Sequence, residues 1–402
     1  MKYGIFGGSF DPFHSGHLSM VEGALASKAV DKVLVVPAGM SPFKPDYTAT
    51  PPVYRYFMTK KALSHVKNCE VLPIDLLRAG VSYTIDTVRQ IKAGMNIKKD
   101  DSFFFLCGTD IIFSLERWYK IEELVKEVTF LIASRPGILN EESKKRVKEM
   151  ENLLHTRISF FPIDGVNISS SEIKADHIFR EMPETVLSFV KKHDLYREDN
   201  PLLFLKQSTC EAFFHWQQEL FRSLSPKRLL HSLNVGLLCA RYAKRFSLDI
   251  DKAFTAGVLH DCAKGFPLDR QRKLAEKGGC VADYNDSSIH APAGAYYAKT
   301  HFGIEDEDIQ NAIWYHTVGR KGMSGLEKAV FLADKIEPSR NYDDLEEIRA
   351  LAEIDLVEAV LSCMIAVKEV LPKKGETVHP DTIEAIEELS SMVTNRRKEN
   401  WK

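Results

Sequence analysis

The sequence has 402 residues, of which 44% are hydrophobic and 27% are charged, with 54 Lys and Arg against 56 Asp and Glu. This composition excludes disordered and fibrous chains, and the length predicts two or three domains of roughly 150 residues each. Charge is balanced in residues 1–200 and again in 201–402, which excludes the basic excess of a nonspecific nucleic-acid binder. No apolar run reaches the ~18 residues of a membrane span, and the seven scattered cysteines lack a Cys-x-x-Cys. We therefore expect free thiols and a cytoplasmic protein with neither membrane nor nucleic-acid partners.

Short apolar runs alternate with amphipathic segments through the first half of the chain. The runs are four to six residues long, bounded by Gly, Pro, Asp or Asn, and they predict strands at 3–6, 32–36, 71–76, 103–106, 130–133 and 158–162. The segments between them predict helices near 17–29, 53–66, 84–94, 116–127 and 141–154. This alternation predicts a parallel sheet covered on both faces, a Rossmann-like doubly wound α/β domain with ligands at the carboxyl ends of its strands.

The second half follows a helical period instead. One apolar stripe contains Leu229, Leu233, Leu237 and Ala240, and almost no alternation of period two occurs between residues 203 and 392. The change of period near the polar segment 196–201 predicts a junction. We expect an α/β domain over 1–198 and an all-α domain over 199–402.

Two glycines and two histidines follow the first predicted strand, in the order Gly7-Gly8-Ser9-Phe10-Asp11-Pro12-Phe13-His14-Ser15-Gly16-His17. The glycines allow the backbone to approach a ligand closely, and the start of a helix offers unpaired N–H groups to an anion. A plain surface turn is the alternative reading. Two histidines three residues apart at a strand-to-helix turn favour phosphate chemistry over it.

This run resembles the His-x-Gly-His motif of the nucleotidylyltransferase superfamily. Segments 168–174 and 190–196 resemble a second signature of the same superfamily. Segments 41–45, 78–87, 107–119 and 134–137 resemble one member, the nicotinate-nucleotide adenylyltransferases, and the likeness covers residues 1 to about 197. It implies that ATP and nicotinate mononucleotide react to give the dinucleotide and pyrophosphate. The nucleophile is already a charged phosphate, so no general base is needed, and catalysis rests on alignment and on stabilising charge at the α-phosphate.

The resemblance also implies roles for individual residues. The implied catalytic residues are His14, His17 and Lys44, which act together with Mg²⁺. Trp118 is implied to stack on the pyridine ring. The implied binding sets are Gly7, Gly8, Ser9, Phe10, Asp11, Ser169, Ser170, Ser171 and Lys174 for ATP, and Tyr83, Thr84, Asp110, Trp118 and Arg135 for the mononucleotide. Lys174 departs from the family's usual Arg and lacks its bidentate fork. A half-buried structural Trp118 and an amidated mononucleotide as acceptor remain open alternatives.

Histidines and aspartates recur at intervals of 18 to 30 residues in the helical half. Such spacing places them on five different helices, and imidazoles and carboxylates that converge inside a bundle suit a divalent transition metal. Each histidine taken singly is more simply a core residue, whereas the ordered set is specific. The set is His231, His260, Asp261, His290, His316 and Asp334.

The ordered set resembles the HD metal-dependent phosphohydrolases and their two-metal branch. The resemblance implies that His231, His260, Asp261 and Asp334 hold one ion, and that Asp261, His290 and His316 hold another. Segments 259–265 and 333–340 resemble the branch that cleaves diadenosine tetraphosphate to two ADP, with iron or manganese, and with Lys264 and Arg340 as phosphate contacts. A nucleoside monophosphatase, a cyclic-dinucleotide phosphodiesterase and a nucleotide-sensing module without turnover remain alternatives.

Overall fold

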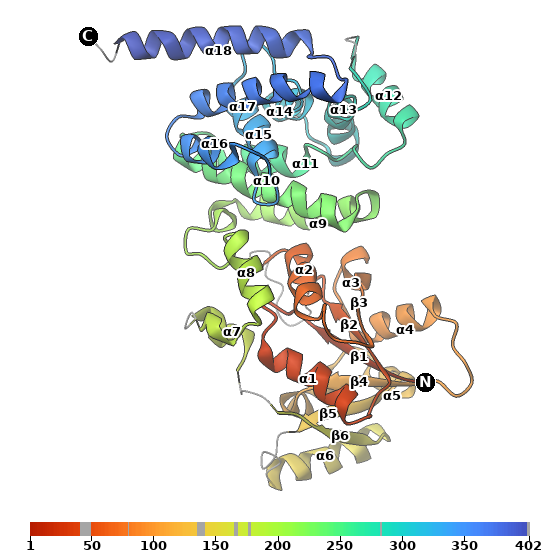
Figure 1. Ribbon diagram of the computed structural model, residues 1–402. Coiled ribbons are helices and arrows are strands. Elements are labelled where there is room, and N and C mark those ends of the chain that lie inside the picture. Colours follow the sequence, from red (N-terminus) through yellow and green to blue (C-terminus); the bar gives the residue numbers. More distant parts are fainter. Residues whose placement is uncertain are drawn as a thin grey trace. The chain divides into compact units, whose positions relative to one another are not determined.

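The structure, a computed structural model, describes residues 1–40, 50–78, 80–134, 141–164, 168–175, 178–281 and 284–399. The chain forms two compact units, Met1–Glu198 and Asp199–Lys402 (Figure 1). Each unit has its own hydrophobic core, so each is described by itself.

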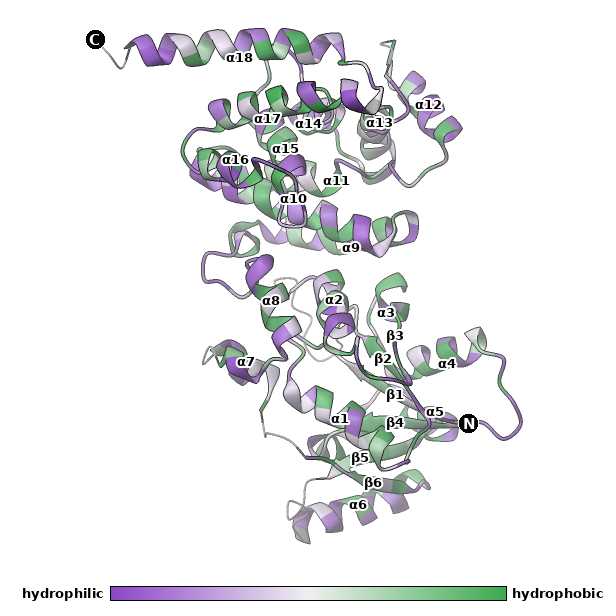
Figure 2. Cartoon of the chain, viewed as in Figure 1, coloured by the Kyte–Doolittle hydropathy of each residue, from purple (hydrophilic) through white to green (hydrophobic). Residues whose placement is uncertain are grey.

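The first unit contains a parallel sheet of six strands in the order β3-β2-β1-β4-β5-β6. Parallel register pairs Ile5 with both Leu34 and Phe105, which places the middle of β1 at the centre of the sheet. The strands β2 and β4 are hydrophobic along most of their length (Figure 2), because helices cover both faces of the sheet. The strand bounds are β1 Lys2–Gly8, β2 Lys32–Pro37, β3 Cys69–Val71, β4 Ser102–Cys107, β5 Thr129–Ser134 and β6 Ile158–Pro162.

Helices alternate with these strands, and the predicted doubly wound α/β class is confirmed. Their bounds are α1 Ser15–Ala26, α2 Pro52–Ala62, α3 Ile74–Leu77, α4 Thr84–Gly94, α5 Ile121–Glu127, α6 Glu141–Leu154, α7 Ser170–Ala175 and α8 Glu184–Lys192, with the 3-10 turns η1 Thr109–Phe113, η2 Leu115–Arg117 and η3 Phe179–Glu181.

Two predicted elements were wrong in detail. The strand predicted over 71–76 is a three-residue strand that ends at Val71, followed by the short helix α3. Pro73 cannot donate to a sheet ladder, and it precedes the first residue of α3. The helix predicted over 116–127 starts only at Ile121, after the 3-10 turn η2.

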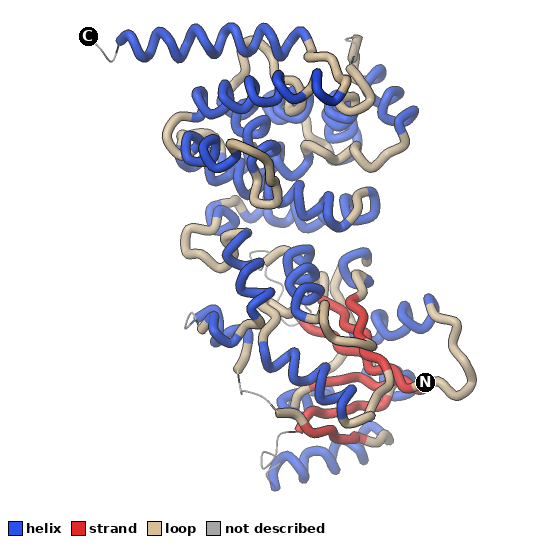
Figure 3. The backbone as a smooth tube through the Cα atoms, in the orientation of Figure 1, coloured by secondary structure: helices blue, strands red, loops and turns tan. Residues whose placement is uncertain are grey.

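In the second unit, the described residues form helices joined by turns and loops, with no strand among them, as predicted (Figure 3). Side-chain caps fix two of its central helices: Ser225 caps α10, which has Pro226 at its first position, and Ser324 with Glu327 forms a capping box on α15. The first long helix, α9, belongs to the bundle, since Phe213 packs edge-on against Phe254 of α11 at 5.0 Å. The bounds are α9 Gln207–Ser223, α10 Pro226–Arg245, α11 Ile250–Leu259, α12 Leu268–Lys277, α13 His290–Phe302, α14 Glu307–Tyr315, α15 Gly325–Ile336, α16 Leu345–Ala352, α17 Leu356–Val370 and α18 Pro380–Glu399, with the turns η4 Pro201–Phe204 and η5 Pro372–Lys374.

Two further features bear on the setting of the chain. Among the described residues, no helix has both the length and the apolarity that a membrane crossing requires. Cys107, Cys239, Cys262 and Cys363 are buried free thiols, in keeping with the expected absence of a disulfide framework.

Candidate functional site

The turn between β1 and α1 carries the first predicted site. The strand ends at Gly8 and His14 directly precedes α1, so residues 9–14 form the turn. Phe10 and Phe13 are fully buried, and Phe10 has a left-handed φ of 50°. A Cβ at Gly8 would lie 2.9 Å from the ring of Phe10, so a larger residue does not fit there. Buried aromatic rings therefore fix this turn, and the Phe10 side chain, predicted among the ATP contacts, belongs to the core.

The two predicted catalytic histidines lie against each other. Their rings stack with centroids 3.6 Å apart, and the backbone N–H of His14 donates to Nδ1 of His17 at 3.2 Å. A neutral His17 ring that accepts at Nδ1 carries its proton on Nε2. Burial lowers the pKa of His14 to about 4, and burial together with His14 lowers the pKa of His17 well below its ordinary value. Near pH 7 both rings are therefore neutral and can meet a phosphate as N–H donors.

The later predicted phosphate motif lies beside this turn. Lys174 Nζ donates to a carboxylate oxygen of Asp11 at 3.0 Å, and the Ser170 hydroxyl donates to the carbonyl of residue 12 at 2.9 Å. Ser169 directly precedes α7, where its hydroxyl accepts the backbone N–H of residue 172 at 3.2 Å, and Ser171 lies in the first turn of that helix. The structure thus brings two segments of the predicted ATP set together from more than 150 residues apart.

Two side chains outside the prediction hold this arrangement in place. The buried guanidinium of Arg55, on α2, donates to the carbonyls of residues 9, 39 and 50 at 2.7, 2.8 and 2.8 Å. The Tyr196 hydroxyl donates to Asp11 at 2.7 Å. Burial opposes the charge on Asp11, but Lys174 and Arg55 outweigh it and lower the pKa of that carboxyl. An arginine inside the apolar run 53–58 was the available signal for this role, because a buried charge requires partners.

The predicted mononucleotide residues lie at the carboxyl ends of neighbouring strands. The backbone N–H of Gly39, just after β2, donates to the Ser82 hydroxyl at 2.9 Å, and this bond holds the segment that leads into α4. Tyr83 and Thr84 open that helix, while Asp110 lies in η1, which follows β4. Carboxyl ends of parallel strands share one edge of the sheet, so these residues belong to the same edge as the β1 turn.

Trp118 packs on the edge of the sheet core. Its ring meets Phe105 edge-on at 5.5 Å and Phe130 at 6.2 Å, and its Nε1 is buried without a hydrogen-bond partner among the described residues. An unpaired indole N–H leaves a donor for a ligand. The predicted catalytic Lys44 and the predicted mononucleotide contact Arg135 lie outside the described residues.

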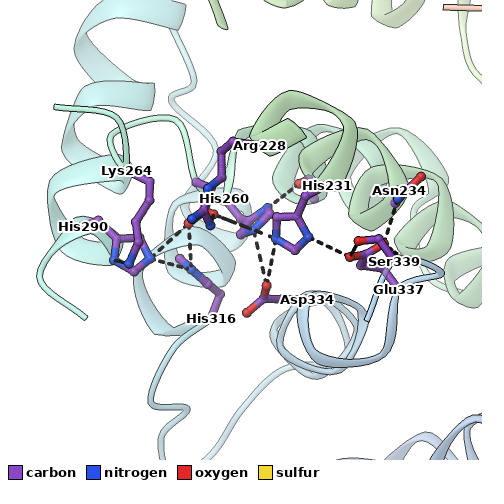
Figure 4. Close-up of polar contacts among 12 residues, drawn as sticks. Arg228, His231, Asn234, His260, Lys264, His290, His316, Asp334, Glu337 and Ser339 are labelled. Atoms are coloured by element: carbon purple, nitrogen blue, oxygen red, sulfur yellow. Dashed lines mark hydrogen bonds and ion pairs between the residues drawn. The ribbon is translucent and has the colours of Figure 1, made fainter. Parts of the chain in front are cut away.

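In the second unit, five helices bring the six predicted metal ligands together, and Figure 4 labels the four histidines and Asp334. One ligand lies within α10, two follow directly after α11, one opens α13, one follows α14, and one lies in the last turn of α15. In that order they are His231, His260 with Asp261, His290, His316 and Asp334, and all six are buried.

The ligand atoms form two groups that share Asp261. The donor atoms of His231, His260 and Asp261 lie within 4.8 Å of one another, and so do those of Asp261, His290 and His316. Asp334 joins the first group, with its Oδ1 3.1 Å from Nε2 of His231 and 3.7 Å from Nε2 of His260. Nε2 of His260 is buried and has no hydrogen-bond partner among the described residues. Imidazole and carboxylate donors converging around an orphaned ring nitrogen fit a divalent metal ion.

The charges of this cluster differ from one ligand to the next. Histidines and a lysine nearby outweigh burial and lower the pKa values of Asp261 and Asp334 well below the ordinary range, so both carboxylates are charged. Burial lowers the pKa of His260 to about 4, and burial together with His260 and His290 lowers the pKa of His316 well below its ordinary value. Burial would also lower the pKa of His231, but the neighbouring carboxylates raise it to about 9.

Four cations surround the cluster. The guanidinium of Arg228 donates to Asp261 at 2.8 Å, and Lys335 and Arg340 donate to Asp334 at 2.5 and 2.7 Å. Lys264, a predicted phosphate contact like Arg340, lies with Nζ 2.8 Å from Nδ1 of His290. Arg228 was not predicted. Its place one helical turn before a ligand histidine on α10 was the available signal.

A close crossing of α10 and α11 fixes the distance between the ligands that these helices carry. A Cβ at Gly257 would lie 2.7 Å from the Cα of Gly236, and a Cβ at Gly236 would lie 3.2 Å from the backbone nitrogen of Val258. Backbone atoms cannot turn aside as side chains do. Glycine at both positions therefore allows the two helices to approach this closely.

Comparisons with known proteins agree with this division of the chain. A cytidylyltransferase-like family matches residues 5–176, and the HD domain family matches residues 228–339. A relative named "Probable nicotinate-nucleotide adenylyltransferase/Ap4A hydrolase", from Mycoplasma pneumoniae, is 30% identical over 370 residues, which covers 91% of this chain and 98% of the relative. A relative named "Bis(5'-nucleosyl)-tetraphosphatase, symmetrical", from Halalkalibacterium halodurans, is 38% identical over 169 residues, covering 41% of this chain and 90% of the relative.

Among solved structures, a predicted HD superfamily hydrolase involved in NAD metabolism, from Clostridium acetobutylicum, is 37% identical. It covers 43% of this chain and 94% of its own, with a TM-score of 0.40. A Plasmodium falciparum nicotinic acid mononucleotide adenylyltransferase complexed with NaAD is 21% identical, and covers 48% of this chain and 97% of its own with a TM-score of 0.39.

Proposed function

This chain belongs to the family of two-domain proteins that join a cytidylyltransferase-like nicotinate-nucleotide adenylyltransferase region to an HD domain, and from that premise we propose that it is an enzyme with two activities. The first unit transfers AMP from ATP to nicotinate mononucleotide, a step of NAD biosynthesis. The second unit hydrolyses diadenosine tetraphosphate to two ADP. The observation that carries the proposal is the match to a relative of that name across nearly the full length of both chains.

In the first reaction, a phosphate oxygen of the mononucleotide attacks the α-phosphorus of ATP while the bond to pyrophosphate breaks. The neutral His17 ring is fixed by its Nδ1 contact, so its Nε2–H is the donor that can face the developing charge. A cation and a hydroxyl lie beside the same turn, because Lys174 contacts Asp11 and the Ser170 hydroxyl donates to the carbonyl of residue 12. We propose that Lys44 adds a second cation, that Arg135 and Trp118 contact the mononucleotide, and that Mg²⁺ neutralises the polyphosphate.

Pyrophosphate release measures the first activity. The full-length chain is mixed with ATP, Mg²⁺ and either nicotinate mononucleotide or nicotinamide mononucleotide, and both acceptors are also supplied in competition. We expect release with the acid as the preferred acceptor. The H17N variant keeps a polar side chain of similar size and loses most of the release. Preference for the amide would replace nicotinate in the proposal, and no release with either acceptor would refute the first activity.

For the second reaction, we propose that the two groups around Asp261 hold two divalent ions, iron or manganese. Such ions supply Lewis acidity and a nucleophile derived from water at neutral pH. The chain's own residues hold those ions and bind phosphate. Arg228, Lys264, Lys335 and Arg340 lie around the ligands, so positive side chains are available to a polyphosphate.

Product analysis tests the second activity. The full-length chain loaded with Mn²⁺ or Fe²⁺ is incubated with diadenosine tetraphosphate, and the nucleotides are separated. We expect ADP as the sole product, whereas AMP with ATP would indicate an asymmetric cut. The D261N variant keeps the size of a shared ligand, so it is expected to lose this activity and keep adenylyl transfer. Tight nucleotide binding without turnover would favour a sensing module, and faster turnover of AMP or of a cyclic dinucleotide would favour another hydrolase.

We also propose that the chain works in the cytoplasm. Its buried thiols are not oxidised to disulfides, which is typical of proteins in a reducing compartment. The three proposed substrates are all intracellular nucleotides. Fractionation of cells that produce the chain, with a periplasmic or secreted control, tests this.

A further inference from the structure

The four ligand histidines differ in the group that contacts Nδ1, the ring nitrogen that faces away from the cluster. Each turns Nε2 toward the shared centre, and the other ring nitrogen, Nδ1, meets a second partner. Nδ1 of His260 and of His316 lies 2.7 Å from a backbone carbonyl, at residues 257 and 313. Nδ1 of His231 lies 3.0 Å from a carboxylate oxygen of Glu337, and Nδ1 of His290 lies 2.8 Å from the ammonium of Lys264. Figure 4 shows these two contacts at opposite ends of the cluster.

These partners act on metal binding in opposite directions. A neutral imidazole that binds an ion through Nε2 carries its proton on Nδ1, so that atom requires an acceptor. A carboxylate is a stronger acceptor than a backbone carbonyl, and it also makes the ring a better donor to the metal. An ammonium has three N–H donors and no lone pair, so it favours the tautomer with the proton on Nε2, the atom that the ion needs.

Glu337 is built into the fold as a fixed partner. Its side chain is fully buried and also accepts from Asn234 Nδ2 at 2.7 Å and from the backbone N–H of Ser339 at 2.7 Å. Asn234 lies one turn after His231 on α10, while Glu337 directly follows α15, the helix that carries Asp334. The carboxylate therefore joins the two helices that supply the first group, and it holds the ring of His231 with Nε2 toward Asp334 at 3.1 Å.

The two groups also differ in charge. The first contains two carboxylates, Asp261 and Asp334, and the second contains only the shared Asp261. Lys335 and Arg340 offset part of the charge on Asp334, and Arg228 contacts the carboxylate that both groups share. Among the described contacts, only Lys264 places a cation at Nδ1 of a ligand histidine, and these three cations do not.

We propose that the two metal positions are unequal: the group with His231 binds its divalent ion first and more tightly because Glu337 supports it, and Lys264 weakens the group with His290. The inference rests on the proposed metal-dependent function of the second unit. Glu337 is here a positioning residue, since it acts through His231. Lys264 must release His290 when the second ion binds, which leaves its ammonium available to a substrate phosphate.

Direct metal titration tests the proposal without an activity assay. The full-length chain is stripped with a chelator and titrated with Mn²⁺ in the absence of nucleotide, and the signal of free Mn²⁺ is followed by electron paramagnetic resonance. We expect two binding classes with dissociation constants at least about tenfold apart. E337Q is expected to raise the constant of the tight class about 10- to 100-fold, the usual effect of losing such a partner. K264M is expected to lower the constant of the weak class.

Two variants on α15 serve as matched controls. E327Q removes another buried glutamate, which pairs with Arg320 and not with a ligand, and K328M removes another partly buried lysine. Both are expected to leave the two constants unchanged, even where they lower the unfolding temperature, which separates positioning from general stability. If E337Q does not fold, K264M decides the question alone.

Three results would overturn the inference. A single binding class, a loss in E337Q confined to the weak class, or a weak class that K264M leaves unchanged or loosens would each contradict it. In all three cases Mn²⁺ still binds, so the proposed metal-dependent function stands. The absence of any Mn²⁺ binding would overturn that function together with the inference.

Discussion

Gly257→Ala adds one methyl group at the crossing of α10 and α11, where the structure leaves no room for it. The new Cβ would lie 2.7 Å from the Cα of Gly236 and 3.0 Å from its backbone nitrogen. Carbon atoms in contact normally lie about 3.5–4.0 Å apart, so the helices must separate by roughly 1 Å. Overpacking of this kind costs about 1–3 kcal/mol, and the better helix propensity of Ala returns up to ~1 kcal/mol. We therefore expect a net loss of about 1–2 kcal/mol.

The same separation moves the metal ligands. His231 lies five residues before Gly236 on α10, and His260 follows three residues after Gly257. Metal sites tolerate ligand distances within about 0.2 Å, so a shift of roughly 1 Å between two ligands of one group should raise the Mn²⁺ dissociation constant at least tenfold.

Thermal unfolding and Mn²⁺ titration of the full-length chain measure both effects, and Gly294→Ala is the matched control. Gly294 lies inside α13, and a Cβ there would meet nothing closer than 3.4 Å, an ordinary contact. We expect this control to be neutral or slightly stabilising in the second unit. Equal unfolding temperature and equal Mn²⁺ affinity in G257A and the wild-type chain would refute the role of this crossing.

Three further predictions concern the first unit. The pKa of His14 is about 4 in the folded state, below its value of 6.5 in the unfolded chain. The free energy of unfolding should therefore fall by about 3 kcal/mol as the pH is lowered from 6.5 to 4. NMR of 13C-labelled histidine should show no titration of this ring above about pH 5.5. R55M leaves three carbonyls without their donor and removes one of the cations near Asp11, so urea unfolding should show a loss of about 3–5 kcal/mol, which the wild-type value would contradict. K174M should raise the KM for ATP about tenfold in the pyrophosphate assay and K174R should restore it, whereas an unchanged KM would confine Lys174 to its pair with Asp11.

The order of strands and helices was predictable because apolar periodicity reflects burial, which is local in sequence. Where two propensities competed, the prediction was wrong. Residues 71–76 are apolar enough for a strand, but Pro73 breaks the ladder and a helical turn follows. The six proposed ligands were predictable for a different reason: few structural roles require histidine and aspartate in that order. Their partner Glu337 carries no such pattern, because glutamates are common in any sequence and are mostly found at the surface.

Contacts between distant segments account for most of what the sequence did not reveal. Arg55 reaches one carbonyl in the β1–α1 turn and two between β2 and α2, and Lys174 meets Asp11 across 163 residues. The glycines of the α10–α11 crossing likewise have meaning only once two helices are in contact, since an isolated glycine within a helix merely lowers its propensity. Local patterns therefore identify chemical groups, and the tertiary fold decides which of them are supported.

The balanced charge of the chain has a structural counterpart at both sites. Three of the cations proposed to meet phosphate are already paired with carboxylates: Lys174 with Asp11, Arg228 with Asp261, and Arg340 with Asp334. Such pairs cancel at a distance, so they do not attract nucleic acid as a basic patch would. In the second unit, an ion bound by Asp261 and Asp334 would satisfy those carboxylates and leave Arg228 and Arg340 free for another anion. Metal loading would then create the local positive potential that a polyphosphate requires, while the protein surface stays near neutral.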